Sequence, residues 1–275
     1  MSVSLRCYST SLGCPKNRVD TERLLGSLGV ALVPVESPDE AELVFINTCA
    51  FIQPATEESV RTIAQAIADI EELPKRPLLA VAGCLVGRYH AEDLAPELPE
   101  VDLWLDNSDL EEWPAMLARK LGLPEPTVPG RILSTGPSYA WLKISDGCRH
   151  ACSFCAIPNI RGGHRSHCKD MIVREARALL DQGVNIAFDT IGKCNYQPDV
   201  SRADWLSRLC AEGYDTQIVM SMDIPRRSNF ADRGGVGYSY LLDTFAPLAS
   251  EAGVPDRAWE NLLYRNALRI YKGQK

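Results

Sequence analysis

Short apolar runs alternate with helical patterns over roughly the first hundred residues of the chain. Residues 43–46 (LVFI) and 78–81 (LLAV) are apolar throughout, which is typical of strands buried on both faces of a parallel sheet, and residues 3–8 predict a weaker strand. Two stripes at helical spacing lie between the predicted strands. The first consists of Thr21, Leu24, Leu25 and Leu28 and stops at Gly29, and the second consists of Val60, Ile63, Ile67 and Ile70. This alternation predicts an α/β fold with a parallel sheet and right-handed crossovers.

The pattern changes at residues 122–138, a stretch rich in proline and glycine that predicts a linker. After it, residues 139–144 predict a strand, and residues 171–182 predict a helix that ends at Gly183. A second helix is expected to begin with a capping-box-like pair, Ser201 and Asp204, and to end at Gly213. Residues 216–222 then predict a strand with Asp223 at its carboxyl end.

Three cysteines stand close together in residues 146–155 (DGCRHACSFC), and we call Cys148, Cys152 and Cys155 the loop cysteines. A structural zinc or an electron-transfer cluster usually takes four protein ligands, whereas three cysteines hold a four-iron cluster with one iron open to another ligand. Zinc remains the alternative, because four nearby residues could offer a fourth ligand: His150, His164, His167 and Cys168.

Three further cysteines each follow a predicted strand, and we call Cys14, Cys49 and Cys84 the edge cysteines. The carboxyl ends of parallel strands meet at one edge of the sheet, where such folds bind their ligands. We therefore expect the edge cysteines to meet around one cluster. The alternative, three unrelated cysteines packed as small apolar side chains, does not account for the same position after three strands.

Composition sets the remaining limits. The 275 residues are 45% hydrophobic and carry a net charge of −7, as in ordinary globular proteins. No basic run offers a grip on a phosphate backbone, which disfavours a nucleic-acid partner. Neither a secretory signal nor an apolar run of membrane-spanning length is evident, so we expect a cytoplasmic protein with reduced thiols and no membrane contact.

The loop cysteines, with an aromatic residue before the last of them, are embedded in longer motifs. On these motifs, residues 1–184 resemble the radical S-adenosylmethionine (SAM) methylthiotransferases. Pro15 and Lys16 favour the type that modifies an aspartate of a ribosomal protein, because the tRNA-modifying type usually carries Gln-Met there. The motifs are SLGCPKN (residues 11–17), NTCAF (47–51), AGC (82–84), WLKISDG (141–147) and AIPNIRG (156–162).

The resemblance implies a flavodoxin-like parallel sheet in the amino-terminal domain. It also implies two 4Fe–4S clusters and SAM as cofactors. The loop cysteines would bind the cluster whose open iron chelates SAM, with Phe154 as a further cofactor-binding residue, and the edge cysteines would bind the cluster that supplies the methylated sulfur. A 5′-deoxyadenosyl radical would take hydrogen from an aspartate side chain of a small-subunit ribosomal protein, after reduction by a donor such as a flavodoxin. No residue of the chain is assigned as a catalytic acid or base.

The resemblance changes near residues 183–186. Residues 185–275 are similar to the last two βα units of a phosphotriesterase-related amidohydrolase, in which an aspartate matching Asp223 is a metal ligand and proton acceptor. The paired and later histidines of that family have no counterpart, since the chain has four histidines and none after residue 167. The joined parts predict an incomplete (β/α) barrel of about three strands, too few to close. Its open edge favours a homodimer.

These observations predict four segments: an iron–sulfur domain (1–121), a linker (122–138), the start of a radical-SAM domain (139–184) and amidohydrolase-like units (185–275). The first functional hypothesis is a methylthiotransferase impaired by truncation of its barrel. The second is an iron–sulfur-binding fusion fragment without turnover. The third is a metal-dependent hydrolase remnant, which the missing histidines disfavour.

Overall fold

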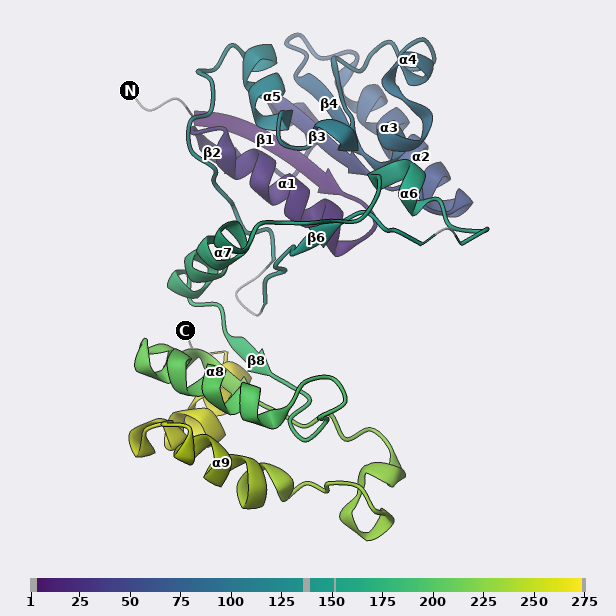
Figure 1. Cartoon of the computed structure of the whole chain (residues 1–275). Coiled ribbons are helices and arrows are strands. Elements are labelled where there is room, and N and C mark those ends of the chain that lie inside the picture. The colour runs from purple at the N-terminus through teal and green to yellow at the C-terminus, as the bar shows by residue number, and fades with distance from the viewer. Residues whose placement is uncertain (1–3, 136–138, 151, 274–275) are drawn as a thin grey trace. The chain divides into compact units, whose positions relative to one another are not determined.

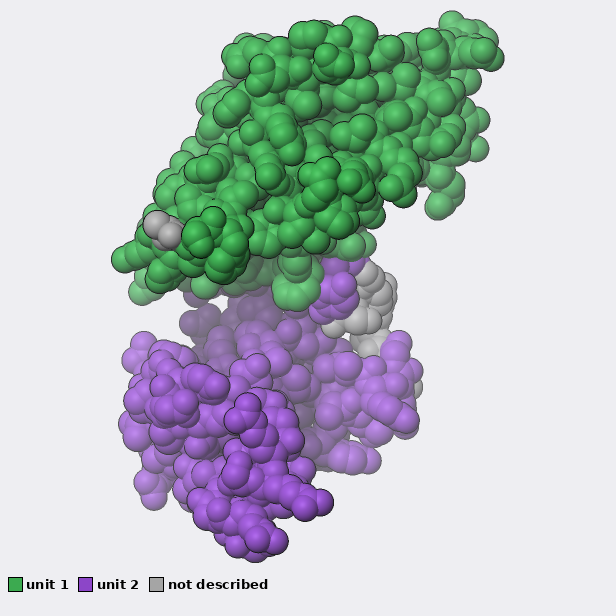
Figure 2. All heavy atoms as spheres, turned by 90° about the vertical axis from the view of Figure 1, so that its right-hand side faces the viewer, with its two compact units in different colours: residues 1–134, 141–174 green, residues 135–140, 175–275 purple. Residues whose placement is uncertain are grey.

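The computed structural model describes residues 4–135, 139–150 and 152–273, which form two compact units. Unit 1 contains residues 1–134 and 141–174, and unit 2 contains residues 135–140 and 175–275 (Figure 2). The edge cysteines and the loop cysteines all belong to unit 1. Within the described ranges, no helix combines the length and the apolar character needed to cross a bilayer.

Unit 1 is built on a five-stranded parallel sheet with the strand order β2-β1-β3-β4-β5 (Figure 1). This is the flavodoxin-like order, so the predicted α/β fold with a parallel sheet is confirmed. Two strands, β2 and β5, have no counterpart among the predicted strands. The five strands are β1 (Ser4–Ser11), β2 (Ala31–Pro34), β3 (Leu43–Thr48), β4 (Leu78–Gly83) and β5 (Leu103–Leu105).

Helices cover both faces of this sheet (Figure 1). Alternate residues of β3 point to opposite faces: Val44 and Ile46 pack with α2 and α3, while Leu43 and Phe45 pack with α1 and α5. All four of these β3 side chains are fully buried, which explains why the strand is apolar throughout. The helices are α1 (Pro15–Ser27), α2 (Gln53–Ile70), α3 (Cys84–Tyr89), α4 (Ala91–Leu94) and α5 (Trp113–Leu121).

The remainder of unit 1 corrects one prediction. Residues 139–144 do not form a strand, and pairing begins only at β6 (Ser145–Asp146), which is antiparallel to β7 (Arg165–Ser166). The prediction was wrong because the buried side chain in this stretch, Lys143, is held by ion pairs and not by neighbouring strands. Helix α6 (Ile157–Arg161) follows the loop cysteines, and α7 (Lys169–Asp181) ends at Gly183 as predicted.

Unit 2 contains a two-stranded parallel sheet of β8 (Ile186–Phe188) and β9 (Ile218–Met220), so no closed barrel is formed by its described residues. Helices α8 (Asp199–Ala211) and α9 (Ala246–Glu251) contribute to its apolar core, together with π-helical turns at Leu241–Phe245 and Asn261–Arg265. Helix α10 (Asn266–Tyr271) follows the second of these turns. The predicted capping box was wrong. Helix α8 begins two residues before Ser201, where Asp199 accepts a hydrogen bond from the Gly192 amide and pairs with Arg202.

Candidate metal centre

The edge cysteines lie at the carboxyl edge of the sheet in unit 1. Cys14 precedes α1, Cys49 directly follows β3, and Cys84 is the first residue of α3, directly after β4. Cys14 is exposed, Cys49 is half-buried and Cys84 is buried. Burial is the main cause that raises the pKa of the Cys84 thiol, and the neighbouring Cys49 and Cys14 thiols raise it further. Because β1, β3 and β4 are parallel neighbours in the sheet, the three cysteine segments leave it at the same edge.

Close backbone packing at this edge explains the small residues beside the edge cysteines. A Cβ on Gly13 would lie 2.7 Å from the Cys49 sulfur, so only glycine leaves room for that side chain. Gly83 has φ of 99°, and a Cβ there would collide with the side-chain oxygen of Asn47. The glycines of the SLGC and AGC motifs thus bring the edge-cysteine segments together.

Asn17 connects these segments through its buried side-chain amide. Its Nδ2 donates to the carbonyl oxygens of Leu12 and Thr48, at 2.9 and 2.7 Å. The Cys84 thiol donates to Asn17 Oδ1 across 3.6 Å, and the Arg161 guanidinium donates to the same oxygen. One amide therefore contacts the loop before Cys14, the end of β3 and the Cys84 side chain.

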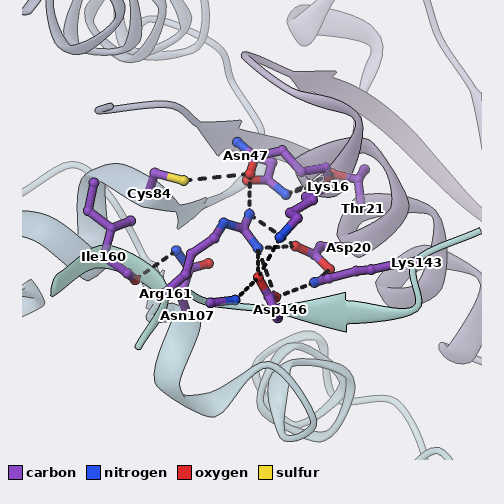
Figure 3. Close-up of polar contacts among 12 residues, drawn as sticks. Lys16, Asp20, Thr21, Asn47, Cys84, Asn107, Lys143, Asp146, Ile160 and Arg161 are labelled. Carbon is purple, nitrogen blue, oxygen red and sulfur yellow. Dashed lines mark hydrogen bonds and ion pairs between the residues drawn. The ribbon is translucent and has the colours of Figure 1, made fainter. Parts of the chain in front are cut away.

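A buried ion-pair network, formed by Asp20, Lys143, Asp146 and Arg161, lies next to this amide (Figure 3). Lys143 Nζ is 2.6 Å from Asp20 and 2.5 Å from Asp146, and Arg161 Nη1 is 3.2 Å from Asp20 and 3.0 Å from Asp146. All four side chains are at most 6% exposed. The network joins α1 to both ends of the segment that contains the loop cysteines.

Opposite charges shift the pKa values of two members of the network, Asp146 and Arg161. Burial alone would raise the pKa of the Asp146 carboxyl, but Arg161 and Lys143 outweigh it and hold that pKa well below its usual range. Burial would likewise lower the pKa of Arg161, yet Asp20, the Cys84 thiol and Asp146 keep it above the ordinary arginine value. Arg161 also lowers the pKa of Cys84, opposing the effect of burial.

The loop cysteines are more open to solvent than Cys84. Cys148 and Cys155 are half-buried, and Cys152 is exposed. Phe154, predicted to contact a cofactor, is 86% exposed. Gly147, with φ of 69°, makes the turn into the loop, and the Cys148 amide donates to the Gly162 carbonyl across 3.2 Å.

The donor set fits the group that the sequence implies. Each cysteine set supplies three soft sulfur ligands, which is the chemistry that iron–sulfur clusters require. Ala151 lies outside the described residues. Among the residues that are described, no three His, Cys, Asp or Glu side chains form a group that could hold a metal ion. The assignment of the six cysteines as cluster ligands stays a prediction.

The ion-pair network itself was not predicted from the sequence, although three of its members lie in motifs quoted above. Lys143 and Asp146 belong to WLKISDG, and Arg161 belongs to AIPNIRG. A usable signal is present: charged residues recur within otherwise apolar or small-residue motifs on both sides of the loop cysteines. Their partner on α1, Asp20, carries no such signal, because an aspartate in a helix ordinarily faces solvent.

Similarity to known proteins divides along the chain as the motifs predict. Residues 6–106 match the family described as uncharacterized protein family UPF0004, and residues 162–271 match the phosphotriesterase family. Two curated relatives are named ribosomal protein uS12 methylthiotransferase RimO. One, from Nitratidesulfovibrio vulgaris, is 70% identical over 177 residues, and the other, from Oleidesulfovibrio alaskensis, is 63% identical over 177 residues. Each alignment covers 64% of this chain and 41% of the relative, so the chain spans less than half the length of these relatives.

Solved structures give only weak matches. The phosphotriesterase homology protein from Escherichia coli has a TM-score of 0.36 and 16% identity, covering 98% of both chains. A resiniferatoxin-binding protein from Rhodobacter sphaeroides has a TM-score of 0.34 and 17% identity, covering 88% of this chain and 63% of the other. The chain is thus similar to methylthiotransferases in its amino-terminal part and to phosphotriesterase-related sequences in its carboxy-terminal part.

Asp223 in unit 2 lies after β9, at the strand end where it was predicted, with φ of 47°. Its carboxylate forms an ion pair with Lys193. The four histidines of the chain all belong to unit 1, so none is available from within unit 2 as a co-ligand for this carboxylate.

Proposed function

We propose that unit 1 carries both cluster-binding sites of a radical-SAM methylthiotransferase, in a chain whose turnover is impaired because its barrel is incomplete. The observation that carries this proposal is the position of the edge cysteines at one sheet edge, beside the network that also holds the segment of the loop cysteines. The sequence identity of 70% to a named methylthiotransferase supports the same reading.

The names of the relatives suggest the substrate class. The target would be an aspartate side chain of small-subunit ribosomal protein uS12, and a small reductant protein such as a flavodoxin would deliver the electron. When bound, the two clusters and SAM would supply reduction, removal of a hydrogen atom from an unactivated carbon, and the methylated sulfur. Six thiolates of the chain would hold the two clusters, and the buried ion-pair network holds the two cysteine segments in place.

Impaired turnover follows from what lies after the loop cysteines. A methylthiotransferase would continue with further barrel strands that contact SAM, whereas the corresponding residues here match the phosphotriesterase family. The described part of unit 2 offers two parallel strands of three residues each. Without groups that orient SAM and the substrate, the rate should fall by orders of magnitude, because lost positioning alone has that effect.

The test uses the full chain, reconstituted anaerobically with iron and sulfide and then reduced. It is incubated with SAM and ribosomal protein uS12; 5′-deoxyadenosine is quantified and the ribosomal protein is weighed by mass spectrometry. We expect slow release of 5′-deoxyadenosine, absent in Cys152→Ala, and little or no methylthio product. Release no faster than in Cys152→Ala would contradict a radical-SAM function and leave a binding module, and abundant product would contradict impairment.

A further inference from the structure

Arg161 occupies a position between the two cysteine sets of unit 1. It is the last residue of α6, six positions after Cys155, and the chain turns sharply behind it at Gly162, where φ is 74°. Its side chain is nearly fully buried and runs back toward α1, where it donates to Asp20 (Figure 3). It also donates to the Asn17 side chain. A single guanidinium therefore spans from the loop-cysteine segment to the sheet edge.

Asn17 relays this contact to the edge cysteines. Its Oδ1 accepts from Arg161 and from the Cys84 thiol, while its Nδ2 is fixed by the carbonyls of Leu12 and Thr48. Because these four contacts use both ends of one amide, Asn17 cannot follow a displaced Arg161 without leaving Cys84. Movement of α6 is thus transmitted to the Cys84 side chain.

The backbone of α6 packs directly on α3, the helix that begins with Cys84. A Cβ on Gly87 would lie 2.6 Å from the Ile160 carbonyl oxygen, so glycine permits this close approach. The same carbonyl accepts from Asn107 Nδ2 across 3.4 Å. Helices α6 and α3 therefore approach each other closely at Ile160 and Gly87, one residue before Arg161 and three residues after Cys84.

The charge balance of the network suits an anionic neighbour. Lys143 and Arg161 match the two carboxylates of Asp20 and Asp146 in number. Lys16, on the rim, adds a third cation 3.6 Å from Asp146. The member of the network that reaches toward Cys84 is Arg161, because it donates to the same Asn17 oxygen as the Cys84 thiol.

From these contacts we infer that Arg161 is a positioning residue that couples the two cysteine sites, so that order at the loop cysteines depends on order at the edge cysteines and the reverse. The inference rests on the proposed function for its meaning, but the coupling itself is a property of the chain. The coupling predicts that a substitution of Arg161 changes the local order around Cys84, although 77 positions separate the two residues in sequence.

Hydrogen exchange of the full chain without clusters tests the coupling directly. In Arg161→Lys, the charge stays but one ammonium cannot reach Asp20, Asp146 and Asn17 together. We expect amide exchange to become about tenfold faster both in residues 145–163 and in residues 82–88, because local openings of the two segments are linked. Arg161→Gln should give the same pattern with a larger effect.

The matched control is Arg76→Gln. Arg76 also makes two contacts with a carboxylate, that of Asp102, but it lies just before β4, at the opposite end of that strand from Cys84. We expect its exchange effects to stay near residues 76–79 and 100–102. Faster exchange confined to residues 157–163 in both Arg161 variants, with residues 82–88 as in the wild type, would overturn the inference.

Cluster loading provides the second readout. In a variant with all three loop cysteines changed to alanine, only the edge site can load. Adding Arg161→Lys to that variant should lower its iron and sulfide content at least twofold and change the electron paramagnetic resonance signal of the reduced cluster, whereas adding Arg76→Gln should not. Unchanged loading and an unchanged signal would contradict the coupling. If the wild-type chain takes up no iron and sulfide, the proposed function fails, and the exchange pattern still decides whether Arg161 couples the segments.

Discussion

Lys143 and Asp20 form a buried ion pair across 123 positions of sequence, with 2.6 Å between Nζ and Oδ1. Their side chains are 3% and 2% exposed. Taking two charges out of water is costly unless each finds a partner, and here each finds two. The pair fixes the segment that leads into the loop cysteines on helix α1, and through α1 on the sheet that carries the edge cysteines.

Removing one carboxylate from this network should destabilise unit 1 strongly. In Asp20→Asn, Lys143 and Arg161 keep their burial and lose one of their two counter-charges, which for broken buried ion pairs costs about 3–5 kcal/mol. Urea unfolding followed by circular dichroism measures the difference in unfolding free energy. Asp69→Asn, a change of an exposed aspartate on α2, should stay within about 0.5 kcal/mol of the wild type. Equal effects of the two changes would show that the network does not stabilise the fold.

Gly83 and Gly29 offer a matched pair for the packing at the sheet edge. Both have positive φ, of 99° and 68°, but a Cβ at Gly83 would collide with Asn47, whereas the space at Gly29 is open. Gly29→Ala should therefore cost about 1 kcal/mol from backbone strain alone. Gly83→Ala should lower the free energy of unfolding by at least about 2 kcal/mol more than Gly29→Ala does, because Asn47 and Thr48 must move. Thermal unfolding of both variants checks this order, and a smaller loss in Gly83→Ala would be inconsistent with the packing described.

Alkaline pH should weaken unit 2 through Tyr240. Burial and the hydrogen bond that its hydroxyl donates to Asp199 raise the pKa of Tyr240 to about 12. The unfolded chain ionises this group near pH 10, so its contribution to stability is fully present below about pH 10 and is lost as the pH rises through about 12. Tyr240→Phe should show a shallower fall in stability over this interval. Tyrosinate absorbance and urea unfolding between about pH 9 and about pH 12 measure the pKa and the unfolding free energy. The same dependence of unfolding free energy on pH in the wild type and in Tyr240→Phe would argue against the raised pKa.

Cysteines that are not assigned to a cluster should differ in the rate at which their thiols react, according to their burial. Burial raises the pKa of the Cys7 thiol to about 12, while Cys194 is exposed. Because the thiolate is the reactive form, we expect iodoacetamide to modify Cys194 at least about a hundredfold faster than Cys7 in the folded chain. Peptide mass spectrometry after timed labelling gives both rates. Comparable rates in the folded chain, with full reaction of both in urea, would show that the β1 core is not packed as described.

The sequence predicted those parts of the fold that rest on local patterns. Strands β3 and β4 are apolar throughout because each is covered by helices on both faces, and Gly183 and Gly213 end their helices with positive φ. Strands β2 and β5 escaped prediction because they are short edge strands with less burial, which leaves a weaker apolar signal. The strand predicted at residues 139–144 is absent, because an apolar stretch in the sequence does not show whether a partner strand exists.

The candidate site divides in the same way. The position of the edge cysteines after their strands follows from parallel-sheet topology, so three strand ends in sequence sufficed to predict it. The ion-pair network depends on residues more than a hundred positions apart, such as Asp20 and Arg161, and pairing at that distance leaves no periodic trace in a single sequence. The structure adds this network, and with it the link between the two cysteine sets.

Iron and sulfide analysis of the anaerobically reconstituted chain, with its absorbance spectrum, tests the central claim most directly. Two three-cysteine sets should bind about eight iron and about eight sulfide per chain, with charge-transfer absorbance in the visible region. Cys84→Ala should reduce both contents to about half, since one cluster loses a ligand, whereas Cys210→Ala, a change of a buried cysteine in unit 2, should leave them unchanged. Stoichiometric zinc without charge-transfer absorbance, or iron content that Cys84→Ala does not alter, would contradict the account.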